Sequence, residues 1–223
     1  MRFLIVTLGC AKNEVDSDRM RALLLADGFE ETTDAAEADV AIVNTCSFLA
    51  SATEESVEAT LELAEERFEG VRACPIVMCG CVPSRYGDAL AAELPEVAAF
   101  VRAEDEDGIV AVVRDVLGLA GEKDERLPQT LRTVEGTSAF VKISEGCDRF
   151  CTFCAIPYIR GRYHSRPADE IVSEVTALME GGVREVVLIG QDTGVWGCDL
   201  GEGETLASLL RLVADAVRPF GGW

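Results

Sequence analysis

Residues 139–154 read AFVKISEGCDRFCTFC, and the rest of the chain is organised around this stretch. The apolar run at its start is typical of a buried strand, and three cysteines follow at Cys147, Cys151 and Cys154. A loop that leaves a strand can wrap three thiolates around one centre, but no fourth cysteine lies near enough for a closed site. Three protein ligands on a [4Fe–4S] cube would leave one iron open to a substrate or cofactor.

The length and composition indicate a globular protein. The 223 residues suffice for one large domain or two ordinary ones, and 48% of them are hydrophobic. No stretch approaches the roughly 18 consecutive apolar residues that a membrane span requires. The first ten residues, MRFLIVTLGC, are better interpreted as a buried strand than as a signal peptide, because no small-residue cleavage site follows. We therefore expect a cytoplasmic protein that does not enter a membrane.

The cysteine count and the charge limit the function further. Nine cysteines in a cytoplasmic chain favour metal or redox chemistry over a disulfide framework. The net charge of −20 repels phosphate backbones and favours basic protein partners. A nucleic-acid substrate is therefore the less favoured alternative.

In the first half of the chain, apolar runs alternate with amphipathic stretches. The first helix is expected to be capped by Asp16 and Ser17 and closed by Asp27-Gly28. Strands are predicted at 3–8, 39–44, 75–78 and 99–101, and the later helices near 52–67, 87–93 and 106–119. Such alternation predicts an α/β fold with an open parallel sheet of the Rossmann or flavodoxin-like type.

Three further cysteines each follow one of the predicted strands. Cys10, Cys46 and Cys81 lie just past the carboxyl ends of three consecutive strands, where an open α/β sheet forms its ligand crevice. The first strand is expected beside both the second and the third, so the three thiols can converge on one site. Alternatively, each thiol is an inert, buried hydrophobe. Cys79, two residues before Cys81, should point to the opposite face and belong to the core, which leaves Cys81 as the ligand.

A linker is predicted at residues 121–136, because this stretch is charged, contains Pro128 and shows no apolar periodicity. It would separate a first domain, 1–120, from a second domain, 137–223. In the second domain we expect strands at 138–143 and 185–189, and helices at 169–180 and 205–217. This order predicts the beginning of a (β/α) barrel of the TIM type, with the CxxxCxxC loop at its catalytic carboxyl face. Two strands cannot close a barrel, so we expect the chain to be a truncated piece.

The CxxxCxxC motif is similar to the signature of radical S-adenosylmethionine enzymes. The glycine before Cys147 and the aromatic residue before Cys154 also fit that family. The resemblance implies that the open iron chelates the methionyl part of the cofactor. It also implies that Phe153 packs beside the cofactor's adenine, and that Gly190 and Gln191 hold its amino group. A zinc knuckle or buried, inert cysteines are the alternatives.

Both cysteine sets together resemble the methylthiotransferase family of radical enzymes over essentially the whole chain. The motifs TLGCAKN, NTC and GCVPSRY place Cys10, Cys46 and Cys81 at the positions of the ligands of an auxiliary cluster. The first domain then corresponds to the methylthiotransferase domain, and the second to the first part of the radical domain. The resemblance implies two [4Fe–4S] clusters, S-adenosylmethionine as cofactor, and an electron donor such as flavodoxin or ferredoxin.

The family has two main branches. One modifies the β-carbon of an aspartate in small-subunit ribosomal protein twelve, and the other modifies adenosines of transfer RNA. Lys12-Asn13 and Phe48 resemble the ribosomal-protein branch, whereas Tyr158 resembles the transfer-RNA branch. The balance favours the ribosomal-protein substrate, and transfer RNA is the alternative. A non-catalytic iron–sulfur carrier or zinc module is a third, less favoured hypothesis.

Residues 160–166 form a basic run that includes His164, the only histidine. Its arginines fit equally well as contacts to the cofactor carboxylate or substrate and as a plain surface patch. His164 is expected to be a solvated loop residue and not a catalytic base.

Overall fold

The computed structural model describes residues 1–66, 74–119, 131–134 and 136–223 of the chain. It divides into two compact units, Met1–Leu127 and Pro128–Trp223. Each unit carries one of the two cysteine sets. Most of the predicted linker, 121–136, lies outside the described residues.

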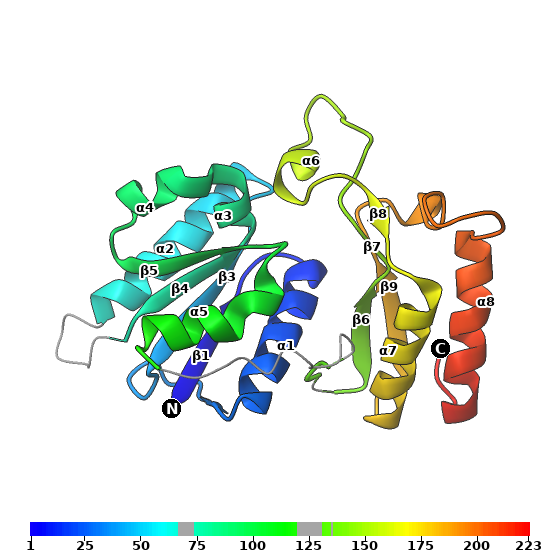
Figure 1. The fold of residues 1–223 in the computed structure, drawn as a ribbon, viewed down its shortest axis with the longest axis horizontal. Coiled ribbons are helices and arrows are strands. Elements are labelled where there is room, and N and C mark those ends of the chain that lie inside the picture. Colours follow the sequence, from blue (N-terminus) through cyan, green and yellow to red (C-terminus); the bar gives the residue numbers. More distant parts are fainter. Residues whose placement is uncertain (67–73, 120–130, 135) are drawn as a thin grey trace. The chain divides into compact units, whose positions relative to one another are not determined.

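The first unit is built on a parallel sheet, which confirms the predicted α/β class. Its strand order is β2-β1-β3-β4-β5, and every neighbouring pair is parallel (Figure 1). The strands are β1 (Arg2–Thr7), β2 (Glu30–Glu31), β3 (Val40–Thr45), β4 (Ile76–Gly80) and β5 (Val97–Arg102). Strands β3 and β4 are buried along their whole length, as expected of central parallel strands that are covered on both faces.

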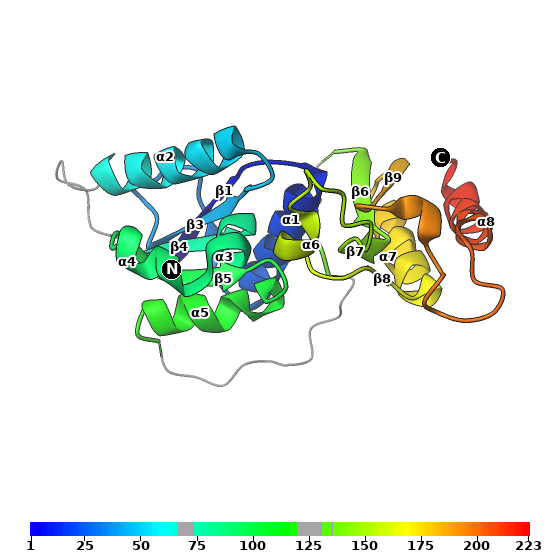
Figure 2. The same ribbon diagram turned by 90° about the horizontal axis from the view of Figure 1, so that it is seen from above.

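Helices cover both faces of this sheet. On one face, α1 (Ala11–Ala26) and α5 (Ile109–Val116) pack against alternate strand residues such as Ile42 and Val77. On the other face lie α2 (Ala50–Glu66), α3 (Cys81–Tyr86) and α4 (Leu90–Glu93). Figure 2 shows α2 and α5 on opposite sides of the sheet. The 3-10 turns η1 (Gly87–Ala89) and η2 (Glu106–Gly108) lead into α4 and α5.

The expected position of the first helix cap is wrong. Helix α1 begins at Ala11, and Cys10 is its N-cap residue, with extended backbone angles. Asp16 and Ser17 lie inside the helix and are buried. The hydroxyl of Ser17 accepts hydrogen bonds from Thr7 Oγ1 at 2.7 Å and from Asn44 Nδ2 at 3.0 Å, so it contacts strands β1 and β3 instead of capping. At the other end, the helix closes near Asp27-Gly28 as predicted.

The expected neighbours of the first strand need a correction as well. The short strand β2, which the apolar pattern did not predict, occupies one side of β1, and β3 occupies the other. Strand β4, the third predicted strand, pairs with β3 and not with β1. Strand β3 is therefore the central one of the three strands that precede Cys10, Cys46 and Cys81.

The second unit contains the predicted pair of parallel strands, β6 (Ser138–Lys142) and β9 (Glu185–Ile189). Helices α7 (Ala168–Glu180) and α8 (Leu206–Val217) pack against them around a core that includes Trp196. Two elements were not predicted, the antiparallel pair β7 (Ser144–Glu145) with β8 (His164–Ser165), and the one-turn helix α6 (Ile156–Ile159). On the side of β9 away from β6, Trp223 exchanges backbone hydrogen bonds with Arg184 and Val186, in the manner of a further parallel strand. The 3-10 turns η3 (Thr193–Val195) and η4 (Arg218–Phe220) flank α8.

A buried ion network holds α7 against β6. The side chain of Glu174 is 2% exposed, and its two oxygens each accept a hydrogen bond at 2.7 Å, from Arg132 and from Arg166. The same guanidinium groups also donate to backbone carbonyls, Arg132 to Phe140 at 2.5 Å and Arg166 to Lys142 at 2.7 Å. Since a buried carboxylate is tolerated only when it is paired and hydrogen-bonded, this network fixes α7 on the strand.

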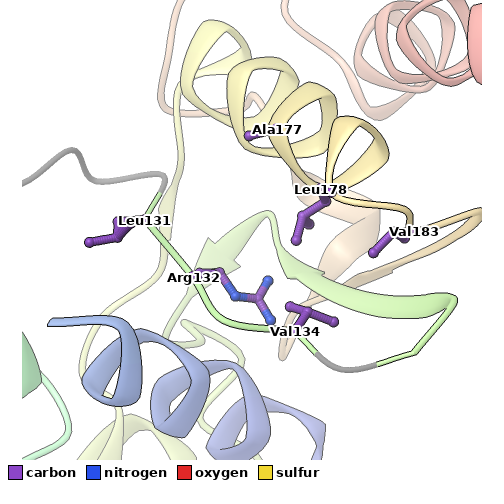
Figure 3. Close-up of a pocket in the computed structure, with 7 residues that line it drawn as sticks. Leu131, Arg132, Val134, Ala177, Leu178 and Val183 are labelled. Carbon is purple, nitrogen blue, oxygen red and sulfur yellow. The ribbon is translucent and has the colours of Figure 1, made fainter. Parts of the chain in front are cut away.

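A cavity of about 250 Å³ lies beside this network, between residues 131–134 and the carboxyl-terminal half of α7 (Figure 3). Most of the residues that line it are apolar, among them Leu131, Val134, Leu178 and Val183. The cavity is at the amino-terminal end of β6 and β9, whereas the CxxxCxxC loop follows the carboxyl end of β6. It is therefore not part of the candidate site. Within the described ranges, no helix is both long enough and apolar enough to cross a membrane.

The buried network predicts a large stability effect. Glu174→Ala leaves two buried guanidinium groups without their carboxylate, so we expect the free energy of unfolding of the second unit to fall by about 3–5 kcal/mol. Both tryptophans, Trp196 and Trp223, lie in this unit, and their fluorescence in a urea titration measures it selectively. The control is Asp215→Ala, which breaks the exposed pair with Arg218 and should cost less than about 1 kcal/mol. Equal losses for the two variants would contradict the role assigned to the network.

Candidate metal centres

The first cysteine set lies at the carboxyl edge of the parallel sheet. Thr7 pairs with Asn44, and Asn44 in turn pairs with Cys79, so the three strands end at the same height. Thr45 pairs with Gly80, which makes Cys46 and Cys81 the next residue on each of two adjacent strands. Cys10 comes three residues after the end of β1 and is the N-cap residue of helix α1. The predicted placement of three thiols at one edge is thus what the register produces.

Cys10 and Cys46 border one small space around Gly9. A Cβ placed on Gly9 would lie 2.5 Å from Cβ of Cys46, 3.1 Å from its Sγ and 3.4 Å from Oδ1 of Asn13. The thiol of Cys10 donates to that same Asn13 oxygen at 3.5 Å. Only a glycine therefore permits the close approach of the Cys10 and Cys46 turns.

Hydrogen bonds join the turn at Cys46 to the turn at Cys81. Thr45 Oγ1 donates to the carbonyl of Cys79 at 2.5 Å and accepts from the Val82 amide at 3.2 Å. Arg85 donates to the carbonyl of Ser47 at 2.6 Å. The backbone of Cys46 itself is held by Ser56, which accepts from its amide and donates to its carbonyl. Both turns are therefore fixed by side chains as well as by the sheet.

Two other cysteines of the first unit belong to the core. Cys79 is fully buried among Val101, Ile109 and Val113, as expected. Burial, with a smaller contribution from Glu106, raises the pKa of the Cys79 thiol well above its ordinary value. Because thiolates are the metal-binding form, this environment disfavours Cys79 as a ligand. Cys74 is buried in a separate apolar cluster.

The second cysteine set lies on one loop, which extends with α6 beyond the carboxyl end of β6 (Figure 1). Cys147 is buried, Cys154 is half-buried and Cys151 is exposed. The Cys147 amide donates to the carbonyl of Gly161 at 3.3 Å, and the Cys154 amide donates to the carbonyl of Cys151 at 2.9 Å. These two bonds fold the loop back on itself, so that all three thiols lie on the segment 147–154.

An ion pair ties this loop to the loop that follows β9. Arg149 Nε lies 2.6 Å from Asp192 Oδ2. The hydrogen bond and the charge of Asp192 raise the pKa of Arg149, and the nearby Cys147 and Cys151 raise it further. The guanidinium therefore supplies positive charge close to two of the three thiols.

The residues predicted to bind the cofactor lie around this loop. Phe153 is 89% exposed, and Gln191 is half-buried. Gly190 follows β9, where a Cβ would lie 2.5 Å from the hydroxyl of Ser144. Phe150, which was not predicted, has a φ of 45°, the only positive φ of a non-glycine residue in the described ranges. Its ring packs edge to face against the ring of Tyr158, with 6.3 Å between the two ring centroids.

The basic run 160–166 is not a uniform surface patch. The side chain of Arg160 is 4% exposed and lies 4.0 Å from Glu145, and Arg166 belongs to the buried network around Glu174. The guanidinium of Arg162 lies over the Phe150 ring, 4.8 Å from its centroid. Only Arg162 among the three is exposed at the cysteine loop, and His164 is exposed as expected.

The donor sets fit iron–sulfur cubes better than a single ion. In the described part of the chain, no group of three His, Cys, Asp or Glu side chains is arranged to hold one metal ion. A zinc ion needs its sulfurs about 2.3 Å from one point, whereas a cube offers a separate iron to each thiolate. Three cysteines per set match a cube in which three irons have a protein thiolate and the fourth is open.

Asn13, Asn44, Thr45 and Ser56 were not predicted as site residues, although all are buried beside the first cysteine set. For two of these residues, the sequence contains a pattern that could have predicted a role in the site. Asn44 and Thr45 end an otherwise apolar strand, VAIVNT, and buried polar side chains at such a position need partners.

Two family models match the chain. The model described as Uncharacterized protein family UPF0004 matches residues 2–102. The model of the Radical SAM superfamily matches residues 141–211, which include the CxxxCxxC loop.

Curated relatives match almost the whole chain. The protein named ribosomal protein uS12 methylthiotransferase RimO of Trichlorobacter lovleyi is 41% identical over 220 residues. The protein of the same name from Symbiobacterium thermophilum is 43% identical over 225 residues. The alignments cover 94% and 96% of this chain, and 49% and 46% of the relatives. The chain thus spans about half the length of the curated relatives it matches.

Solved structures share the fold. TsrM from Kitasatospora setae, a radical S-adenosylmethionine methyltransferase solved with tryptophan substrate and a SAM analog, matches with a TM-score of 0.64 and 15% identity. That match covers 98% of this chain and 51% of TsrM. The cobalamin-dependent enzyme OxsB matches with a TM-score of 0.56 and 9% identity, over 96% of this chain and 36% of OxsB. At these identities the likeness concerns the fold alone.

The cysteine loop predicts a difference between two glycines with similar backbone angles. Gly146 and Gly161 have φ of 68° and 75°, but only at Gly146 would a Cβ clash, at 2.1 Å from the carbonyl oxygen of Arg162. Gly161→Ala should lower the free energy of unfolding of the second unit by roughly 1–2 kcal/mol, the cost of a left-handed conformation. Gly146→Ala should lower it by clearly more. Tryptophan fluorescence in urea measures both, and equal losses would show that the Gly146–Arg162 contact is unimportant.

Proposed function

Because the chain belongs to the methylthiotransferase family of radical S-adenosylmethionine enzymes, we propose that the protein methylthiolates ribosomal protein uS12. The reaction replaces a hydrogen on the β-carbon of an aspartate by a methylthio group. The observation that carries the proposal is the presence, in one chain, of two sets of three cysteines, one at the carboxyl edge of the parallel sheet and one on a single loop.

The two thiol sets have separate tasks in this proposal. Cys147, Cys151 and Cys154 would hold one [4Fe–4S] cluster. The ligands of the second, auxiliary cluster would be Cys10, Cys46 and Cys81. When bound, the clusters and S-adenosylmethionine supply radical generation, sulfur and the methyl group. Three thiols per set leave one position of each cluster open, which suits cofactor binding at one and sulfur donation at the other.

The chain's own residues position these groups. Arg149 holds the cysteine loop against the loop after β9 through its ion pair with Asp192. Phe153 offers an exposed aromatic face for the cofactor's adenine. Gly190 and Gln191, which follow β9, would hold the cofactor's amino group.

The surface charge supports a basic protein substrate. The chain carries a net charge of −20, which attracts basic ribosomal proteins and repels the backbone of transfer RNA. Phe48, an exposed aromatic residue two positions after Cys46, also fits the ribosomal-protein branch. The reaction further requires an electron donor such as flavodoxin or ferredoxin, and its substrate places it in the cytoplasm.

The test is a complementation experiment with the full-length gene. In a strain that lacks the gene, mass spectrometry should show uS12 without the methylthio group, and the wild-type gene should restore it. The Cys10→Ala and Cys151→Ala genes should fail to restore it, whereas Cys198→Ala, at an exposed cysteine of neither set, should succeed. Loss of a methylthio group from transfer RNA, with uS12 unchanged, would instead establish the alternative substrate.

A further inference from the structure

Asn44 occupies the centre of the first cysteine set. It is fully buried, it lies two residues before Cys46, and its side chain contacts the turns that lead to Cys10 and to Cys81. A buried amide has four hydrogen-bonding positions to satisfy, so its contacts define its orientation closely.

The side chain of Asn44 is joined to Asn13 in both directions. Asn13 Nδ2 donates to Asn44 Oδ1 at 3.0 Å, and Asn44 Nδ2 donates to the backbone carbonyl of Asn13 at 2.9 Å. Asn44 Nδ2 also donates to Ser17 Oγ at 3.0 Å. These bonds fix the first turns of α1, which follow the N-cap residue Cys10, against the end of β3.

The orientation of the Asn13 amide follows from these bonds. Its Nδ2 donates to two acceptors, Asn44 Oδ1 and the carbonyl of Thr45 at 2.8 Å. Its Oδ1 must then face the other way, toward the thiol of Cys10 at 3.5 Å. A carbonyl oxygen, and not an N–H group, is thereby directed at the Cys10 sulfur.

The third turn is set by steric contact. A Cβ on Gly80 would lie 2.5 Å from Asn44 Oδ1 and 2.8 Å from the carbonyl oxygen of Thr45. Gly80 therefore lies directly against the Asn44 amide, and the next residue is Cys81. The Asn44 side chain thus contacts residues next to or near each of the three cysteines.

We propose that Asn44 is a positioning residue that sets the spacing of Cys10, Cys46 and Cys81 around the auxiliary cluster. A ligating Cys10 has lost its thiol proton, but the carbonyl oxygen of Asn13 would still face the sulfur, because the two bonds that its amide nitrogen donates fix its orientation. That oxygen would keep the reduction potential of the cluster low. The physical reason is that a partial negative charge beside a ligating sulfur disfavours the added electron, whereas an N–H donor would favour it. This inference rests on the proposed function, because it requires a cluster at these three cysteines.

The experiment uses the chain with Cys151→Ala, which removes the other cluster, reconstituted anaerobically. Iron and sulfide content measure assembly, and a redox titration followed by electron paramagnetic resonance measures the potential. Asn44→Ala should lower the iron content at least twofold. Asn13→Asp places a carboxylate beside Cys10, and it should lower the ratio of reduced to oxidised cluster about tenfold at a fixed potential, a shift of about 59 mV.

The matched control is Thr60→Ala. Thr60 is also fully buried in the first unit, but its hydroxyl donates only within helix α2, to the carbonyl of Ser56 at 2.7 Å. Its iron content and potential should equal those of the parent chain. If the Asn44→Ala chain is unfolded, as judged by loss of its circular dichroism signal, the reduction potential of the Asn13→Asp variant tests the proposal instead.

The outcomes separate the two claims. A parent chain that binds no cluster iron would overturn the proposed auxiliary site, and this inference with it. A parent that binds the cluster, with iron content and potential unchanged in both asparagine variants, would overturn the role of Asn44 and Asn13 alone.

Discussion

The parallel register of β1, β3 and β4 is the constraint on which the candidate site depends. Because Thr7, Asn44 and Cys79 lie side by side, three strands that are far apart in the sequence end at one edge of the sheet. Parallel strands need a crossover between them, and here α1 and α2 carry the chain from that carboxyl edge back to the amino-terminal edge, where the next parallel strand begins. A shift of one residue in either pairing would turn Asn44 away from Asn13 and move one thiol relative to the others.

The three cysteines of each set are brought near one another by different kinds of contact. The first set assembles from three strand ends, so it needs long-range contacts, and a buried polar network around Asn44 supplies them. The second set lies on a single loop, so local geometry suffices, with Gly146 against Arg162 and Arg149 paired with Asp192. Buried polar groups are costly unless all are bonded, so the first arrangement specifies one geometry more strictly than the second.

Much of this arrangement follows from the sequence. The apolar runs located the main strands, and the positions of the cysteines just after them indicated a common edge. The start of α1 was missed because its inward face carries Lys12, Asn13, Asp16 and Ser17, so the apolar period is absent where the helix serves the site. Strands β2, β7 and β8 have two residues each, too few for any period. The role of Asn44 depends on a partner 31 residues away, which no local pattern encodes.

The proposed function requires two independent iron–sulfur centres, each held by three thiols. The most direct measurement is iron and sulfide content after anaerobic reconstitution, in the parent chain and in Cys10→Ala and Cys151→Ala. We expect about eight irons in the parent and about four in each variant, with equivalent sulfide. Stoichiometric zinc without sulfide, or the loss of all iron from a single substitution, would contradict it.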